Sequence, residues 1–262
     1  MNLVTEMPQQ TEMGKCTQHG PYQVRYLPMG SKFLKNDQCP ACAAESAQAQ
    51  REQDIQLAKK QAADLVRRAR IDAGVSLRNI DASFADYVPE EEHEAQNLAN
   101  IQRFCSRVKQ GGGGNVLLLG RPGTGKTMLA SAMVNQLLST GKRCRLINML
   151  DLIREFKDCW RRGADCTETQ LIKQFGSYDL LVIDEVGLGY GSDTEKLFIF
   201  DVLNARYNNM LPTVLLSNLD LTGVKQAVGD RVVSRLKEDG GQVMAFTGRD
   251  RRDNKITADH GC

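Results

Sequence analysis

Five short hydrophobic runs recur in the second half of the chain, and stretches with helical periodicity separate them. Runs of this length that alternate with helices are typical of a parallel sheet whose strands are joined by crossover helices. The pattern therefore predicts an α/β fold over residues 79–262, with strands at residues 116–119, 143–147, 180–183, 213–216 and 243–246.

The stretch that precedes this domain has the composition of a single long helix. Residues 45–73 are rich in Ala, Gln, Lys and Arg and contain few β-branched residues, which favours a helix about 40 Å long. We predict a helical linker over residues 48–78. A narrow hydrophobic stripe fits a helix docked on the α/β domain as well as a free arm, and consists of Ile55, Ala58, Ala62, Leu65, Val66 and Ala69.

Length and composition limit the class of protein. The 262 residues suffice for one α/β domain and a smaller module, and 41% hydrophobic with 25% charged residues is ordinary for a globular protein. The net charge of +2 means that any nucleic-acid surface must be a local patch. Neither a signal peptide nor a run of about 20 apolar residues is present, so we expect a cytoplasmic protein with no membrane partner.

A glycine-rich motif lies between the first predicted strand and a helix that begins near Lys126. Residues 120–127 read GRPGTGKT and match G-x-x-x-x-G-K-[ST], in which backbone N–H groups surround a phosphate, the lysine reaches the β and γ oxygens and the threonine binds magnesium. The sequence therefore predicts an ATP and Mg²⁺ site formed by Gly120, Pro122, Gly123, Thr124, Gly125, Lys126 and Thr127, together with Asp184.

Two acids follow the third predicted strand, about 60 residues after the glycine-rich motif. We expect Asp184 to hold the magnesium shell with Thr127, and Glu185 to polarise the attacking water. The alternative is a solvated turn. The next strand brings Asn218 to the same edge of the sheet, where its amide could orient the water, although asparagine is also common in turns.

With these motifs the chain resembles the DnaC-type helicase loaders and their phage relatives, a branch of the AAA+ ATPases close to DnaA and IstB. The resemblance covers about residues 83–246 and rests on GRPGTGKT at 120–127, DLLVIDEVG at 179–187, PTVLLSN at 212–218 and GDRVVSRL at 229–236. It implies a P-loop AAA+ (ASCE) fold, ATP hydrolysis, and loading of a DnaB-type replicative helicase onto single-stranded DNA. The alternatives are an IstB-like transposition helper ATPase that acts on duplex DNA, and a zinc-dependent DNA-binding regulator switched by nucleotide.

The resemblance also implies that Arg231 and Arg235, in the motif GDRVVSRL at 229–236, are arginine fingers, which contact the ATP of a neighbouring subunit. At positions i and i+4 of a helix the two guanidinium groups share one face, so both could reach a phosphate across an interface. We therefore expect self-association. The alternative is a solvated basic face of the helix.

About 30 residues between the second and third strands resemble the element with which initiators and loaders grip single-stranded DNA. Basic residues at i, i+3 and i+7 predict one helical stripe beside the single tryptophan, which suits phosphate neutralisation and base stacking. The predicted DNA contacts are Arg154, Lys157, Trp160 and Arg161. The alternative is that Phe156 and Trp160 are core contacts.

The chain ends about 16 residues after the last predicted strand, and the resemblance implies that the C-terminal helical lid of most AAA+ proteins is absent. We then expect the nucleotide to be enclosed by Arg235 of a neighbour and by the tail arginines Arg249, Arg251 and Arg252. The individual roles of these three tail residues stay open.

Two ligand pairs lie in the N-terminal head, residues 1–47. Cys16-x-x-His19 and Cys39-x-x-Cys42 are about 20 residues apart, which is the spacing of a structural zinc site, and zinc would supply folding energy that so small a head lacks. Unligated thiols are the alternative. We expect the remaining cysteines to be buried or incidental thiols: Cys105, Cys144, Cys159, Cys166 and Cys262.

The head departs from the pattern of the enteric DnaC proteins, which have a helical helicase-binding head without zinc. Many phage-type relatives carry a similar C-x-x-H-G and C-P-x-C head. The sequence therefore leaves open whether the head binds the helicase, DNA or an initiator protein.

Overall fold

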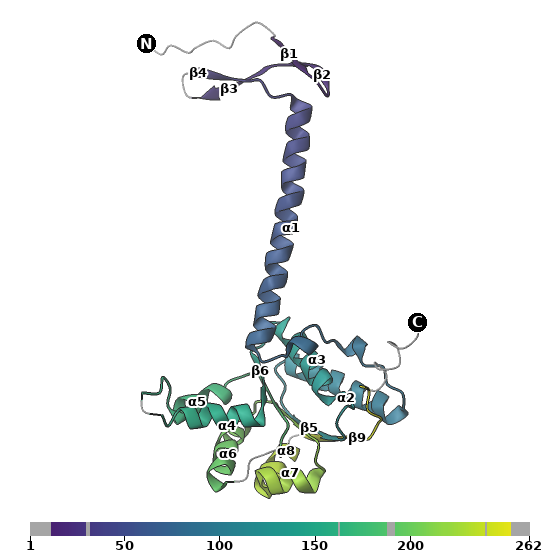
Figure 1. Cartoon of the computed structure of the whole chain (residues 1–262), viewed down its shortest axis with the longest axis vertical. Coiled ribbons are helices and arrows are strands. Elements are labelled where there is room, and N and C mark those ends of the chain that lie inside the picture. Colours follow the sequence, from purple (N-terminus) through teal and green to yellow (C-terminus); the bar gives the residue numbers. More distant parts are fainter. Residues whose placement is uncertain (1–11, 30–31, 162, 188–191, 239, 253–262) are drawn as a thin grey trace. The chain divides into compact units, whose positions relative to one another are not determined.

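The computed structural model describes residues 12–29, 32–161, 163–187, 192–238 and 240–252 (Figure 1). Contacts between residues divide the chain into two units, Met1–Leu65 and Val66–Cys262. The long helix α1 (Pro40–Asp72) crosses this division, which lies inside the segment predicted as a linker. Within the described ranges, no helix combines the length and the apolar composition needed to cross a membrane.

The first unit consists of two antiparallel hairpins and the beginning of α1. Strand β1 (Met13–Cys16) pairs with β2 (Gly20–Gln23), and β3 (Arg25–Met29) pairs with β4 (Lys32–Asn36). Among the described residues of this unit, Val24 and Cys39 are the only hydrophobic residues that are buried. Two-stranded hairpins with so small a core are marginal by themselves and need a further source of stability.

The helix predicted from composition is present and begins earlier than predicted. It has 33 residues and starts at Pro40 instead of residue 45. Proline suits the first turn of a helix, because its missing N–H has no intrahelical acceptor there and its φ angle is already helical. The CPAC segment therefore belongs to the first turn, which places Cys42 on α1 and Cys39 directly before it.

The second unit is built on a five-stranded parallel sheet in the order β6-β7-β8-β5-β9. All five predicted strands are present, as β5 (Asn115–Gly120), β6 (Cys144–Asn148), β7 (Leu180–Asp184), β8 (Thr213–Ser217) and β9 (Gln242–Phe246). The predicted α/β fold with a parallel sheet is confirmed. Because β8 pairs with both β5 and β7, the carboxyl ends of these three strands meet at one edge.

Helices cover both faces of the sheet (Figure 1). One face carries α2 (Glu92–Lys109) and α3 (Lys126–Leu138) with the short 3₁₀ turns Leu77–Asn79 and Phe84–Asp86. The other carries α4 (Met149–Asp158), α5 (Glu168–Phe175), α6 (Asp193–Asn208), α7 (Leu221–Val228) and α8 (Asp230–Lys237). In the part of the chain that is described, no helix follows β9.

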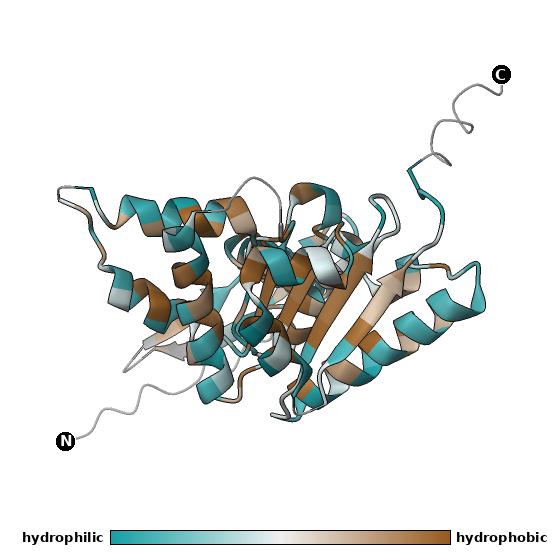
Figure 2. Ribbon diagram, turned by 90° about the horizontal axis from the view of Figure 1, so that it is seen from below, coloured by the Kyte–Doolittle hydropathy of each residue, from teal (hydrophilic) through white to brown (hydrophobic). Residues whose placement is uncertain are grey.

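The three central strands β5, β7 and β8 are buried on both sides, which explains their continuous hydrophobic runs, whereas the edge strands β6 and β9 have partly exposed positions. In β5, Val116 and Leu118 point into the core beneath α2 and α3, whereas Leu117 and Leu119 point into the core beneath α4 to α8. Figure 2 shows the strands as a mostly hydrophobic layer between helices. A strand that must fill two cores cannot alternate polar with apolar residues, so these three strands carry polar residues only at their ends.

One arginine on α6 is completely buried and has no acidic partner among its hydrogen bonds. Arg206 has an exposed fraction of 0% and donates to Thr213 Oγ1 at 2.9 Å, to the Phe175 carbonyl at 2.7 Å and to the Pro212 carbonyl at 2.6 Å. Burial lowers the pKa of its guanidinium to about 9. The side chain ties the end of α5 to the start of β8.

We predict that Arg206→Ala lowers the free energy of unfolding by at least about 3 kcal/mol, because it removes three buried hydrogen bonds and opens a cavity. Urea unfolding followed by circular dichroism would measure the change. The control is Arg103→Ala on the exposed face of α2, which should change stability by less than about 0.5 kcal/mol. Equal effects in the two variants would contradict the structural role of Arg206.

Candidate functional site

The glycine-rich loop connects the end of β5 to the start of α3. Gly120, Gly123 and Gly125 have φ angles of 138°, 79° and 94°, a region that L-residues with side chains rarely adopt. A Cβ atom at Gly120 would also lie 2.0 Å from the Phe246 carbonyl oxygen of β9. The glycines of the motif therefore allow both the curvature of the loop and its close packing against the edge strand.

The ammonium group of Lys126 is buried at the base of this loop. Its Nζ atom donates to the carbonyl oxygens of Gly120 at 2.7 Å and Arg121 at 2.8 Å, and to Asn218 Oδ1 at 3.1 Å. Burial lowers the pKa of Lys126. All three acceptors are neutral, so a phosphate would be a stronger partner for this cation. The structure thus brings Asn218 from the end of β8 to the phosphate-binding loop, as the sequence predicts.

The two predicted magnesium ligands lie together. The Thr127 hydroxyl donates to Asp184 Oδ2 at 2.8 Å, across the gap between the start of α3 and the end of β7. Burial raises the pKa of Asp184, against the lowering effect of the Thr127 hydrogen bond. A hydroxyl and a carboxylate oxygen that share one hydrogen bond are oxygen donors of the kind that Mg²⁺ uses beside a nucleotide phosphate. The donor set therefore fits the ion.

Glu185 follows Asp184 in a left-handed backbone conformation, with a φ angle of 56°. Non-glycine residues seldom adopt this conformation, and it turns the glutamate out of the line of β7. Its backbone N–H donates to Asp184 Oδ1 at 2.7 Å, and its carboxylate accepts a hydrogen bond from the Asn148 side chain. The carboxylate that we expect to activate water is therefore held by an amide from the neighbouring strand.

Sequence reasoning missed Asn148. It is the last residue of β6, opposite Asp184 in the sheet register, and its Oδ1 atom also caps α4 by accepting from the Leu150 N–H at 2.8 Å. One amide thus links the Glu185 carboxylate to the start of α4. A polar residue at the end of a predicted strand was the available signal, but the strand order that makes β6 the neighbour of β7 is not readable from the sequence.

The two predicted finger arginines on α8 have different environments. Arg231 is exposed and forms no hydrogen bond or ion pair with the described residues. Arg235 is half-buried, donates to Asn204, and lies over the rings of Phe200 and Tyr207 at 5.5 and 5.1 Å from their centroids. Arg235 would have to leave these partners to reach a neighbouring subunit.

The predicted DNA-binding cations all lie on the surface, but they do not form one helical stripe. Helix α4 ends at Asp158, so Arg161 lies beyond it. Each cation pairs with a nearby acid: Arg154 with Asp151 at 2.6 Å, Lys157 with Glu195 at 2.6 Å and Arg161 with Asp158 at 3.0 Å. The pairs of Arg154 and Arg161 join exposed side chains and cost little to break, so these two cations are available to a polyanion, whereas the Glu195 partner of Lys157 is only 12% exposed.

The aromatic residues of this segment divide between core and surface. Phe156 is buried and stacks on Phe198 with ring centroids 4.8 Å apart. Trp160 packs on the same ring at 4.9 Å but is 53% exposed, so one side of its indole faces solvent. Cys159 and Cys166 are free thiols, and their half-buried Sγ atoms lie 3.1 Å apart in a hydrogen bond. Cys262 lies outside the described residues.

The four predicted zinc ligands converge in the head. Cys16, His19, Cys39 and Cys42 each direct one ligand atom to a common point, with all four atoms within 4.8 Å of one another. The separations from Sγ to His19 Nδ1 are 3.8 Å for Cys16, 3.9 Å for Cys39 and 3.3 Å for Cys42. Three sulfurs and one imidazole nitrogen form a common tetrahedral donor set for zinc.

The surroundings of the cluster also fit a metal ion. His19 bonds Glu45 Oε1 through Nε2 at 3.0 Å, which orients the ring and leaves Nδ1 for the ion. Hydrogen bonds from the backbone of His19 and Gln18 lower the pKa of Cys16 to about 6, whereas bonding to Cys16 raises that of Cys42 to about 11. Two sulfurs that share one proton repel each other once both ionise, and a divalent cation removes that repulsion.

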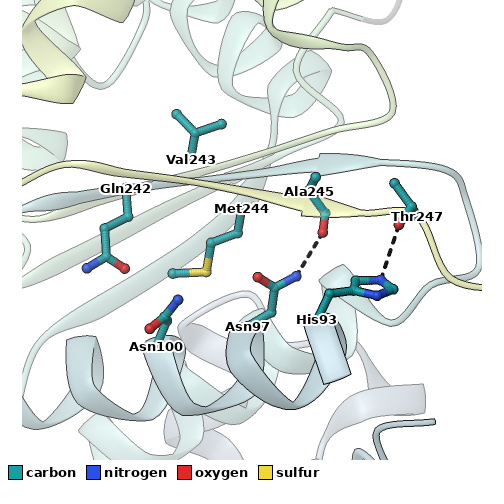
Figure 3. A pocket seen from close by; sticks show the side chains of 8 residues that line it. All are labelled: His93, Asn97, Asn100, Gln242, Val243, Met244, Ala245 and Thr247. Atoms are coloured by element: carbon teal, nitrogen blue, oxygen red, sulfur yellow. Dashed lines mark hydrogen bonds between the residues drawn. The ribbon is translucent and has the colours of Figure 1, made fainter. Parts of the chain in front are cut away.

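A hollow of about 460 Å³ lies between α2 and the edge strand β9 (Figure 3). Its lining contains none of the residues predicted to bind ATP, metal or DNA. The lining residues are His93, Asn97, Asn100, Gln242, Val243, Met244, Ala245 and Thr247.

We predict that the purified chain carries about one zinc ion, and that Cys42→Ser loses it, because the remaining three donors bind far more weakly. Elemental analysis after gel filtration would measure the stoichiometry. Cys166→Ser changes a cysteine outside the cluster and should retain the ion. A zinc-free wild-type chain that remains folded would contradict the prediction.

We predict that Asn148→Asp and Asn148→Ala both slow ATP hydrolysis about tenfold, because each removes the N–H donor to Glu185. Only the alanine variant also loses the helix cap, at about 1 kcal/mol of stability, since aspartate caps as well as asparagine. Steady-state ATPase rates and urea unfolding separate the two roles. Unchanged hydrolysis in both variants would exclude a catalytic role for the contact with Glu185.

Curated relatives of this chain are replicative helicase loaders. The chain is 32% identical to the replicative helicase loader DnaC of Buchnera aphidicola subsp. Schizaphis graminum over 165 residues, which are 63% of this chain and 67% of that protein. It is 31% identical to DnaC of Escherichia coli K12 over 165 residues, 63% of this chain and 66% of that protein. The matched region spans about two thirds of these relatives.

Solved structures share the fold of the second unit. A crystal structure of the DnaC helicase loader matches 66% of this chain and 100% of its own, with a TM-score of 0.57 and 24% identity. The replication initiator DnaA bound to AMPPCP and single-stranded DNA matches 71% of this chain and 55% of its own, with a TM-score of 0.58 and 19% identity. The sheet and its helices therefore have the AAA+ fold of DnaC and DnaA.

A protein-family model identifies most of the chain. The model for the IstB-like ATP binding protein matches residues 47–236, which include the phosphate-binding loop, both acids and the two arginines of α8. The chain therefore belongs to the IstB-like ATP-binding family of AAA+ proteins and is a homologue of the DnaC helicase loaders.

Proposed function

We propose that this protein hydrolyses ATP and uses it to load a DnaB-type replicative helicase onto single-stranded DNA. The observation that carries the proposal is the assembled set of Lys126, Thr127, Asp184 and Glu185 at one sheet edge, in a chain 31–32% identical to DnaC loaders. A carboxylate pair with these neighbours favours hydrolysis over passive nucleotide binding.

In this proposal the glycine-rich loop and Lys126 bind the β- and γ-phosphates, and Thr127 and Asp184 hold Mg²⁺. The ion supplies positive charge to the phosphoryl oxygens when it is bound. Glu185 orients and polarises the attacking water, and Asn218, already within 3.1 Å of Lys126, reports on the γ-phosphate from the end of β8.

Self-association would complete the site. Arg231 is exposed on α8 and can reach the ATP of a neighbouring copy without breaking a contact to the described chain. Arg235 lies one turn further along the same helix. In this proposal its side chain leaves Asn204 and the rings of Phe200 and Tyr207 when it binds a phosphate of the neighbouring copy. Such fingers contribute about a thousandfold or more to hydrolysis in other ATPases and GTPases, so the working unit is an oligomer.

The segment around the end of α4 contacts single-stranded DNA in this proposal. Trp160 is 53% exposed and can offer its ring for base stacking, and Arg154, Lys157 and Arg161 are exposed cations of the same segment. Asn148 caps the same helix while it holds Glu185, so DNA that moves α4 would act on the catalytic carboxylate. The zinc head with α1 then holds the helicase.

A second candidate function is that of an IstB-like transposition helper ATPase on duplex DNA. The match of the IstB-like family model over residues 47–236 favours it. Both functions use the same ATP site, and they differ in the DNA that stimulates hydrolysis.

We predict that single-stranded DNA stimulates ATP hydrolysis more than duplex DNA does, and that Arg231→Ala and Arg235→Ala each reduce the stimulated rate at least about tenfold. Trp160→Ala should weaken DNA binding by about 1–3 kcal/mol, the range for a stacking residue. Rates would be measured with each DNA over a range of protein concentrations. Arg103→Ala, on the exposed face of α2, is the arginine control.

Loading itself is tested with a closed circular single strand, which has no end onto which a ring helicase can thread. We expect the helicase to be retained on the circle only with this protein and ATP. Stimulation by duplex DNA alone, with no retained helicase, would favour the transposition function. Arginine fingers would be excluded if the ATP hydrolysis rate were the same in the two α8 variants as in the wild type and did not depend on protein concentration.

A further inference from the structure

The segment that follows β9 lies directly on the phosphate-binding loop. The backbone N–H of Arg251 donates to the Gly123 carbonyl at 3.0 Å. The Asp250 carboxylate lies so close to Gly123 that a Cβ atom there would be 1.9 Å from Asp250 Oδ1. Since Gly123 also has a φ angle of 79°, only glycine fits between its own turn and the tail.

The Arg251 side chain is bound on three sides. Nη2 pairs with Glu94 Oε2 at 2.6 Å, Nη1 donates to the Val88 carbonyl at 2.7 Å, and the guanidinium lies over the Tyr87 ring at 4.0 Å. The Glu94 side chain is only 4% exposed and also accepts the Glu90 backbone N–H at 2.8 Å. The guanidinium of Arg251 is therefore held by groups of its own chain.

Tyr87 contacts both Arg251 and the phosphate-binding loop. Its ring is 2% exposed, and a Cβ atom at Gly125 would lie 2.8 Å from Tyr87 Cε2. The ring is thus layered between the phosphate-binding loop and the guanidinium of Arg251. Its hydroxyl reaches the Thr124 carbonyl at 3.5 Å, at the outer limit of a hydrogen bond.

Helix α2 fastens the strand from which the tail emerges (Figure 3). Asn97 Nδ2 donates to the Ala245 carbonyl at 2.8 Å, and His93 Nε2 lies 3.1 Å from Thr247 Oγ1. Glu94, one residue beyond His93, then receives Arg251. The first turns of α2 therefore hold both the end of β9 and the tail.

The other two tail arginines differ from Arg251. Arg249 pairs with Glu90 at 2.5 Å, but the two side chains are 58% and 37% exposed. Arg252 is exposed, and its side chain makes no hydrogen bond or ion pair with the described residues. Burial lowers the pKa of Lys126, Asp184 opposes this effect, and the positive charge of Arg252 adds a smaller lowering.

We propose that Arg251 is a positioning residue for the nucleotide: together with Glu94 and Tyr87 it clamps the tail onto the phosphate-binding loop and thereby sets the affinity for ATP. The clamp holds the tail against Gly123 and the Tyr87 ring against Gly125. Because ATP binding by this loop belongs to the function proposed above, this role rests on it.

The charge distribution explains why this pair is a clamp and the Arg249 pair is not. Burial raises the pKa of Glu94, but hydrogen bonds from the Glu90 N–H and from Arg251 outweigh it and hold the pKa below its usual value. Glu94 is thus an ionised, nearly buried carboxylate. Removal of Arg251 would leave that charge unpaired, so the tail and α2 would have to rearrange.

The test compares Arg251→Ala and Glu94→Gln with Glu90→Gln in the full-length protein. The two glutamate variants make the same chemical change in a buried and in an exposed pair. Binding of a fluorescent ATP analogue gives the Kd, ATPase rates give kcat at saturation, and hydrogen exchange of the tail peptide reports on the Arg251 N–H bond to Gly123. Lys126→Ala marks the ATP site itself.

Arg251→Ala is expected to raise the Kd at least about tenfold, to speed exchange of the tail amides, and to leave kcat at saturation within about threefold, because Glu185 is untouched. Glu94→Gln should change the Kd and the exchange in the same direction, and Glu90→Gln should leave the Kd within about twofold. Arg251→Lys, which keeps the charge but loses the planar stacking and forked hydrogen bonding, should lie between.

Faster tail exchange with an unchanged Kd in Arg251→Ala and Glu94→Gln would reduce Arg251 to a structural contact and overturn the proposal. An equal loss of affinity in Glu90→Gln would also overturn it. If Lys126→Ala fails to weaken ATP binding, the ATP site fails and this role fails with it. If Lys126→Ala binds ATP weakly and Arg251→Ala binds it normally, the proposed role of Arg251 fails and the ATP site stands.

Discussion

The parallel pairing of β8 with both β5 and β7 is the constraint on which the nucleotide site depends. It places the ends of three strands at one edge, so that Lys126 lies within hydrogen-bonding distance of Asn218, and Thr127 within hydrogen-bonding distance of Asp184. The strands can hold this register because both of their faces are buried, and a slip in register would expose hydrophobic side chains. The chemistry at the edge is thus maintained by the packing of the two cores beneath it.

Buried polar groups connect this edge to the rest of the second unit. Asn148 joins Glu185 to α4, and the pair of Arg251 with Glu94 joins the tail and α2 to the phosphate-binding loop. Such contacts are costly to leave half-made, which makes the bonded arrangement well defined. They also give two routes by which a partner bound elsewhere can act on ATP: through α4 on the catalytic carboxylate, and through the tail on affinity.

The head depends on a different kind of stabilisation. Its hairpins bury very little, and the convergence of three cysteines and one histidine supplies a metal site in place of a hydrophobic core. The ligand pairs were readable from the sequence because each spans only four residues. That the pairs from β1–β2 and α1 meet at one point required the folded head.

The sequence by itself determined the parts of this protein that are local: the hydrophobic strands, the glycine-rich loop, the acids that end β7, and the zinc ligand pairs. In each case a few neighbouring residues carry the whole signal. The tertiary structure alone decided that Asn148 holds Glu185, that Arg251 binds Glu94, that Arg161 lies off the helix, and that Cys159 meets Cys166. Most of these contacts depend on strand order or on the path of a loop, which joins residues far apart in the chain, and helix ends depend on packing that no local pattern records.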